Sequence, residues 1–145
     1  MSRARGLSLD LARGTRAWAP ARARMNRWAA AALGRLGEGR EVAVRIVGPE
    51  ESRELNRVWR GKDKPTNVLS FSSEHELGDL AICAPVVARE AREQGKQPAA
   101  HWAHMVVHGV LHLLGYDHEN NRDAERMEAR EAKILAQLGM PNPYG

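Results

Sequence analysis

The sequence has a single cysteine and no long apolar segment. Cys83 has no partner for an internal disulfide, and its apolar surroundings indicate a small buried side chain. A lone thiol of this kind is typical of a reducing compartment. No apolar run approaches the ~20 residues that a membrane-spanning helix needs. We therefore expect a soluble cytoplasmic protein with no membrane contact.

Extremes of composition, internal repeats and low-complexity linkers are also absent. Hydrophobic residues make up 43% and charged residues 28% of the 145 residues. These values are near globular averages and argue against wholesale disorder, a collagen-like chain or a coiled coil. The length suits one domain with its own core. We therefore expect residues 1–145 to form a single domain.

Positive charge is concentrated near the N-terminus. The formal net charge is +4, but residues 1–40 contain nine Arg and only two acidic residues, whereas residues 41–145 carry a net charge of −3. A basic stripe attracts a phosphate backbone. Arginine is equally common on the solvated face of an Ala-rich helix. The charge distribution therefore allows nucleic-acid binding without establishing it.

Hydrophobic periodicity predicts strands and helices in alternation. Leu7, Leu9 and Leu11 alternate with polar residues, so the Arg-rich start is interpreted as a strand of the fold and not as a targeting peptide. Strands are predicted at 6–11, 42–46, 67–71 and 79–83, and helices at about 20–36, 50–59, 85–94, 98–114 and 122–138. This order predicts an α/β (α+β) fold with a small mixed sheet of about four strands and about five helices.

Two of these helices have apolar residues that we expect to face the core. In the first helix, the spacing includes Leu36, and Gly37 is expected to end the helix. In the second helix, Leu55, Val58 and Trp59 are expected to be buried.

A histidine stripe runs along the helix predicted at 98–114. At ~100° per residue, His101, His104, His108 and His112 fall within an arc of ~80° on an otherwise apolar helix. Several buried imidazoles are costly without partners. His104 is interpreted as a supporting or proton-shuttling group and His101 as an ordinary polar residue near the helix start.

A metal ion explains the stripe economically. His108 and His112 are one helical turn apart, so both rings can reach one ion. Gly115 can end the helix in a left-handed conformation and turn the chain back, after which His118 supplies a third nitrogen. Three protein ligands leave a fourth position for water, as in catalytic zinc sites. The alternative, histidines at coincidental spacing, is disfavoured because the glycine bend and the third histidine occur together. Asp117 is expected either to orient a ligand ring or to cap the turn.

The spacing predicts a zincin-like metal site on this central helix, because it matches the H-E-x-x-H-x-x-G-x-x-H motif of metzincin proteases except at one position. Gly109 replaces the glutamate that acts as general base in those enzymes. A standard peptidase mechanism is therefore disfavoured. A metal can still lower the pKa of water toward ~7, and Arg60, in a basic loop with Lys62 and Lys64, is a candidate for binding an anionic phosphate.

Four segments resemble the YbeY family of bacterial endoribonucleases, also called rRNA maturation factors. They are HGVLHLLGYDH at 108–118, RGKDKPTNVLSF at 60–71, LGDLAIC at 77–83 and LGMPNPY at 138–144. The resemblance implies one Zn²⁺ ion bound by His108, His112 and His118. It also implies catalytic roles for His108 and for Arg60, which would contact phosphate or stabilise the transition state.

The resemblance further implies a metal-dependent hydrolase that cuts single-stranded RNA. The expected roles are maturation of the 16S rRNA 3′ end from its precursor and late-stage 70S ribosome quality control. Ribosomal proteins, the ribosome and an assembly GTPase are the expected partners of a monomeric protein. Trp59 and Tyr116 have two alternative roles, stacking against RNA bases or packing in the core. Two alternatives stay open: a zinc-dependent peptidase or amidohydrolase, and a non-catalytic ribosome assembly factor stabilised by metal.

Overall fold

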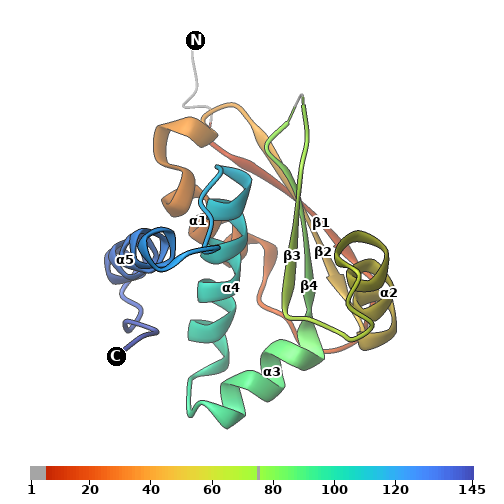
Figure 1. The fold of residues 1–145 in the computed structure, drawn as a ribbon. Helices are drawn as coiled ribbons and strands as arrows, with labels where there is room; N and C mark the ends of the chain where they lie inside the picture. Colours follow the sequence, from red (N-terminus) through yellow and green to blue (C-terminus); the bar gives the residue numbers. More distant parts are fainter. Residues whose placement is uncertain (1–5, 75) are drawn as a thin grey trace.

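A computed structural model describes residues 6–74 and 76–145. Four strands form one mixed sheet in the order β1–β2–β4–β3 (Figure 1). β1, β2 and β4 are parallel, and β3 pairs antiparallel with β4 at one edge. The strand bounds are Ser8–Arg13 for β1, Glu41–Val47 for β2, Val68–Ser72 for β3 and Gly78–Cys83 for β4. The predicted small mixed sheet is confirmed.

Within residues 6–74 and 76–145, five α-helices and one 3₁₀ helix pack around the sheet. Their bounds are Arg22–Leu33 for α1, Gly34–Gly37 for the 3₁₀ helix η1, Pro49–Arg60 for α2, Ala84–Glu93 for α3, Pro98–Leu113 for α4 and Asn121–Gln137 for α5. Figure 1 shows α2 on one side of the sheet and α4 on the other, with α5 beyond α4. No helix in the described part of the chain is long and apolar enough to cross a membrane.

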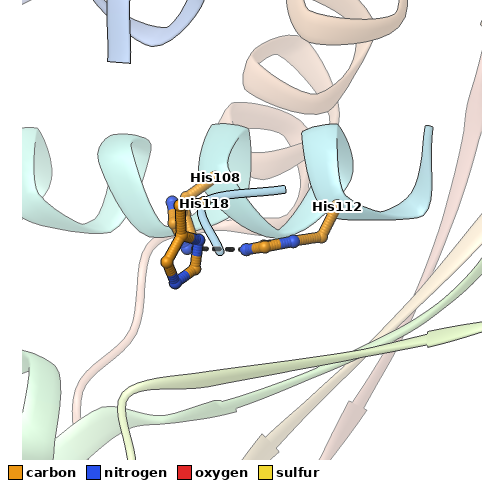
Figure 2. Close-up of side chains that lie close together, drawn as sticks. All are labelled: His108, His112 and His118. Atoms are coloured by element: carbon orange, nitrogen blue, oxygen red, sulfur yellow. Dashed lines mark hydrogen bonds between the residues drawn. The ribbon is translucent and has the colours of Figure 1, made fainter. Parts of the chain in front are cut away.

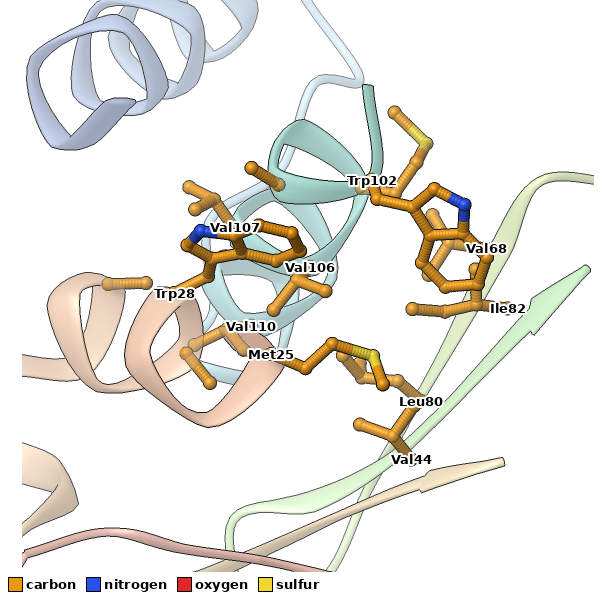
Figure 3. Close-up of a cluster of buried hydrophobic side chains, with 14 of the residues drawn as sticks. Met25, Trp28, Val44, Val68, Leu80, Ile82, Trp102, Val106, Val107 and Val110 are labelled. Atoms are coloured by element: carbon orange, nitrogen blue, oxygen red, sulfur yellow. The ribbon is translucent and has the colours of Figure 1, made fainter. Parts of the chain in front are cut away.

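α4 is the central helix of the larger hydrophobic core. Ten of its sixteen residues are buried. Met25 and Trp28 of α1 pack in the same cluster as Val106 and Val110 of α4 and Leu80 of β4 (Figure 3). A second, smaller cluster lies on the other face of the sheet, where it includes the buried Cys83. The histidine-bearing helix is therefore held on several sides by the core.

Gly109 allows α4 to approach the sheet closely. A Cβ atom added at this position would lie 2.8 Å from Cδ2 of Leu80 and 3.2 Å from Cγ2 of Val68. Such a distance is shorter than ordinary carbon–carbon contact. Close helix–sheet packing thus explains why glycine, and not the glutamate of the protease motif, stands at position 109, where a side chain would point at the sheet.

The helix predicted at about 20–36, with Leu36 on its buried face, extends too far. α1 ends at Leu33 because Gly34 adopts a φ of 57°, and the chain continues as a 3₁₀ helix. Leu36 consequently leaves the apolar stripe and is 59% exposed. The prediction that the helix continues to Gly37 with Leu36 buried is therefore wrong.

The buried face predicted for the helix at 50–59 is also wrong in part. Val58 is 56% and Trp59 is 67% exposed, whereas the buried positions of α2 are Ser52 and Asn56. The Ser52 hydroxyl donates to the carbonyl of Thr66 and accepts from its amide, and the Asn56 side chain donates to the carbonyl of Lys64. α2 therefore uses polar side chains to hold the loop that leads into β3.

Candidate metal centre and adjoining cleft

Three histidines converge at the end of α4. His108 and His112 lie on successive turns of the helix, and their Nε2 atoms are 3.1 Å apart (Figure 2). Gly115 follows the helix with a φ of 97°, and its amide donates to the carbonyl of His112. The chain then reverses and brings the His118 ring to 5.0 Å from the His112 ring and 5.7 Å from the His108 ring, measured between centroids.

The nitrogen atoms of this histidine tripod fit a tetrahedral metal ion. One ring nitrogen from each of His108, His112 and His118 lies within 4.8 Å of the others. Ligands at about 2.0–2.1 Å from a tetrahedral zinc ion are ~3.3 Å apart, so small movements of the rings suffice. His108 and His112 are half-buried and His118 is exposed. The tripod can hold a metal ion and leaves one side open.

Burial favours the neutral form of His112. Desolvation lowers the pKa of this imidazole, and the neighbouring His108 and His118 lower it further. A metal-ligating histidine must have a free lone pair on its ring nitrogen. The direction of this shift favours the neutral imidazole that a metal ligand must present.

The tripod lies in one wall of a cleft of about 790 Å³. β3 is an edge strand, and its residue Ser70 lines the cleft together with Asn67, which directly precedes the strand. The Ser70 hydroxyl donates to the carbonyl of Gly109 across 3.0 Å. This bond ties the strand wall to the helix that carries His108 and His112.

The end of α2 contributes a cation and an aromatic ring to the same cleft. Arg60 lines it and is exposed, and it has no ion-pair partner within residues 6–74 and 76–145. Arg53 and Arg57, by contrast, pair with Asp63 and Glu54. The guanidinium of Arg60 is thus available to an anionic ligand in the cleft.

Trp59 presents its ring beside Arg60. It is exposed and packs edge-to-face against Phe71 of β3, with centroids 5.8 Å apart and planes at 67°. Both rings line the cleft. Tyr116, the other aromatic residue considered from the sequence, lines a separate pocket with Asp123 and Arg126. The aromatic surface of the cleft therefore comes from Trp59 and Phe71.

The family model for "Endoribonuclease YbeY" matches residues 17–139 of this chain. The chain belongs to the endoribonuclease YbeY family. An endoribonuclease YbeY from Halorhodospira halophila is 58% identical over 136 residues, covering 87% of this chain and 88% of that protein. Another, from Stutzerimonas stutzeri, is 52% identical over 146 residues, covering 95% and 91%. The resemblance inferred from the four sequence segments is confirmed.

A solved structure has the same overall fold as this YbeY family member. The solution structure of TM1509 from Thermotoga maritima superposes with a TM-score of 0.58 at 25% identity, covering 90% of this chain and 91% of that one. The similarity extends over nearly all of both chains. It supports the fold described above, in which the helix that carries His108 and His112 packs on a small mixed sheet.

A buried carboxylate behind the tripod was missed in the sequence. Glu131 of α5 is fully buried, with Oε2 2.8 Å from Nδ1 of His108 and 3.2 Å from Nε2 of His104. Its Oε1 accepts a hydrogen bond from the Tyr144 hydroxyl. Burial opposes ionisation of Glu131, but hydrogen bonds from His104, His108 and Tyr144 outweigh it and lower its pKa to about 2. Tyr144 in turn has a raised pKa, because of burial and the adjacent carboxylate.

The sequence does contain a signal for Glu131. Met127, Glu131, Ile134 and Leu135 lie on one face of α5, and all four are buried. A glutamate at an apolar position of a helix indicates a buried partner, since buried glutamate is rare without one. The partners are distant in sequence, so the periodicity of α5 alone does not name them.

The remaining polar residues of the region have structural contacts. The ring of His101 contacts Glu90 at 2.9 Å, and desolvation lowers its pKa against the opposing effect of Glu90. Asp117 accepts a hydrogen bond from the His118 amide, which favours the turn-capping alternative. His104 contacts Glu131, and its ring packs edge-to-face against the ring of His108, with centroids 6.1 Å apart.

Proposed function

We propose that this protein is a metal-dependent endoribonuclease that hydrolyses phosphodiester bonds in single-stranded RNA. The observation that carries the proposal is the histidine tripod, which faces a cleft shared with the unpaired Arg60. Family membership supports the same activity, since the curated relatives are named endoribonucleases. His108, His112 and His118 would hold one zinc ion, because three imidazoles and an open position are typical of catalytic zinc.

When bound by these three histidines, a zinc ion would supply Lewis acidity toward a phosphoryl oxygen and would lower the pKa of water. Arg60 binds the scissile phosphate and neutralises the negative charge that develops as the phosphorus becomes five-coordinate. Ser70 of β3 and Asn67, directly before that strand, line the opposite wall of the cleft. His108 would serve as one of the metal ligands, and it lines the same cleft as Arg60, the residue proposed to bind the phosphate.

The geometry disfavours the peptidase alternative. Gly109 has no side chain, and a side chain there would be directed at Leu80 and Val68 in the sheet. Glu131 does not replace the missing general base, because it is fully buried and contacts His108 through Nδ1, on the side of the ring away from His112. Neither position offers a carboxylate to water in the cleft.

A preference for single-stranded RNA follows from the exposed ring of Trp59. A base can stack on this ring only when it is not paired within a duplex. Lys62 and Lys64 are exposed in the loop after Arg60 and add positive charge near the cleft. Backbone phosphates and one unstacked base can thus be held together.

The cellular substrate that we infer is the precursor of 16S rRNA, cut near its 3′ end in the cytoplasm by a monomeric enzyme. The family resemblance supports this inference, along with late-stage 70S ribosome quality control and binding to ribosomal proteins and an assembly GTPase. Mapping of 16S rRNA 3′ ends in depleted cells tests it. Unprocessed ends should accumulate with a His112→Ala protein and disappear with the wild type.

The direct test is cleavage of a fluorescent single-stranded RNA and of its duplex by purified protein. Cleavage of the single strand should stop after chelation, return with zinc and be lost in His112→Ala. Arg60→Gln should bind zinc but cut poorly, while Arg57→Gln, on the same helix but paired with Glu54, should cut normally. Equal cutting by all preparations would indicate a contaminating nuclease and contradict the proposal. Hydrolysis of casein without RNA cleavage would favour the peptidase alternative.

A further inference from the structure

We propose that Glu131 is a positioning residue for the metal centre and that it holds His108 in the tautomer protonated on Nδ1. The proposal rests on the metal site proposed above, but it concerns a property that the metal-free protein also has. It further assigns Tyr144, in the C-terminal segment, to the support of this site. Together, Glu131, Tyr144, His104 and His108 form what we call the carboxylate network.

The direction of the hydrogen bond defines the tautomer of His108. Oε2 of Glu131 lies 2.8 Å from Nδ1 of His108 and 3.2 Å from Nε2 of His104, while Oε1 accepts from the Tyr144 hydroxyl. One carboxylate oxygen that faces two ring nitrogens serves both only as an acceptor, and this arrangement places a hydrogen on Nδ1 of His108. A neutral imidazole has one such hydrogen, and Nε2 is then left with a free lone pair. That Nε2 atom is the one that lies 3.1 Å from Nε2 of His112. The ligand nitrogen therefore points at the tripod.

The carboxylate itself is held from two further directions. The Tyr144 hydroxyl donates to Oε1, and Nε2 of His104 lies 3.2 Å from Oε2. The Tyr144 and His104 rings also pack edge-to-face, with centroids 5.5 Å apart. These contacts leave Glu131 little freedom to rotate away from His108. A small cavity of about 190 Å³ is lined by Glu131 of α5, His108 of α4, His118 and Tyr144.

The C-terminal segment follows a path that brings Tyr144 to this point. Gly139 ends α5 with a φ of 76°, and the amide of Met140 donates to the carbonyl of Leu135. The chain then passes Asn142, whose side chain accepts from the amide of Tyr144. The last turn of the protein is thus ordered around a hydroxyl group that faces a buried carboxylate.

A second metal ion is the competing interpretation of the carboxylate network. Ligand atoms of His104, His108 and Glu131 also lie within 4.8 Å of one another. An ion there would share His108 with the tripod and would need Nδ1 without its hydrogen. The hydrogen-bond interpretation instead keeps hydrogen on Nδ1 and predicts one ion per chain.

The tautomer can be measured directly in metal-free protein. Long-range ¹H–¹⁵N correlation spectra distinguish a histidine protonated on Nδ1 from one protonated on Nε2, and loss of a signal in His108→Ala assigns it. We expect His108 to be protonated on Nδ1 in the wild type and to lose this preference in Glu131→Ala. A neutral His108 protonated on Nε2 in the wild type would overturn the proposal.

Zinc affinity, measured by competition with a chelating dye, gives an independent readout. We expect Glu131→Gln to weaken binding about 10- to 100-fold, the usual effect of removing such a supporting carboxylate. Tyr144→Phe, at an accessible position that keeps the ring, should weaken it by a smaller factor. Glu125→Gln removes an exposed carboxylate from the same helix and should leave affinity unchanged. Thermal unfolding of each metal-free variant reports on folding.

The outcomes separate this proposal from the proposed function. Unchanged zinc affinity in folded Glu131→Gln and Tyr144→Phe would overturn the positioning role, even if RNA cleavage by the wild type is confirmed. Two zinc ions per wild-type chain, falling to one in Glu131→Gln, would overturn it in favour of the second metal site. Absence of zinc binding by the wild type would contradict the proposed function, while the tautomer spectra would still decide the role of Glu131.

Discussion

Replacement of Gly109 by alanine should destabilise the protein, although alanine is the better helix former. The added Cβ would lie 2.8 Å and 3.1 Å from the two Cδ atoms of Leu80 and 3.2 Å from Cγ2 of Val68. Leu80 is only 1% exposed and belongs to the main core, so its side chain has little room to move. Overpacking of this kind costs about 1–3 kcal/mol, whereas the change from glycine to alanine in a helix gains about 0.5–1 kcal/mol.

The overpacking term is the larger, so we expect a net loss of about 1–2 kcal/mol in the free energy of unfolding. For a chain of 145 residues this corresponds to a fall in Tm of roughly 3–8 °C. Calorimetry or circular dichroism of metal-free protein measures it. The displaced helix should also lengthen the 3.0 Å bond between Ser70 Oγ and the Gly109 carbonyl.

A double-mutant cycle tests whether Leu80 is the cause. Leu80→Val removes the two Cδ atoms that the new methyl group would meet, so Gly109→Ala should cost less in that background than in the wild type. We expect a coupling energy of at least about 0.5 kcal/mol. A Tm for Gly109→Ala equal to or above that of the wild type would refute the packing argument, and strict additivity would show that Leu80 is not the obstacle.

Three further predictions concern the cleft and the core. Arg60→Gln should lower kcat for single-stranded RNA by about 10²- to 10³-fold, the effect of removing one donor to a developing anion, with zinc content unchanged; a normal rate would contradict the role assigned to this guanidinium. Trp59→Ala should weaken RNA binding, measured by fluorescence titration, by about 1–3 kcal/mol, or about 5- to 150-fold in Kd. Trp59→Phe keeps an aromatic ring and Trp18→Ala removes an exposed tryptophan outside the cleft lining, so both should bind nearly as the wild type does. Equal losses for Trp59→Ala and Trp18→Ala would argue against stacking. Cys83 is fully buried, and desolvation raises the pKa of its thiol, so a thiol reagent should modify it only at the rate of unfolding; rapid modification of native protein would show that this part of the core opens.

The central helix and its tripod were predictable because their signals are local. His108 and His112 are one turn apart, and Gly115 and His118 follow within the next few residues, so spacing and helix-ending geometry are enough to bring the rings together. The four strands and five helices were also predicted, since alternation and helical spacing are strong in each segment.

The carboxylate network was not predictable in the same way, because its members come from distant parts of the chain. Glu131 and Tyr144 meet His104 and His108 only when α5 and the C-terminal segment pack on α4. The sequence signal was a glutamate among the buried residues of α5, which indicates an unnamed partner. Identification of the partner requires the tertiary structure.

The exposure of Trp59 was mispredicted because helical spacing does not show which face of α2 is buried. The helix buries Ser52 and Asn56, whose hydrogen bonds hold residues 64 and 66 of the following loop. The choice of a polar buried face places Trp59 and Arg60 at the cleft. Tertiary hydrogen bonding thus overrides the apolar pattern at the point where the proposed function needs an exposed ring.

The most direct test of the account is an anomalous difference map at the zinc absorption edge from crystals of the zinc-loaded protein. We expect one strong peak at about 2.0–2.1 Å from a ring nitrogen of each of His108, His112 and His118. Absence of a peak among these rings, or rings that point apart in the crystal, would contradict the proposal that this helix and the bend after it hold a catalytic metal ion.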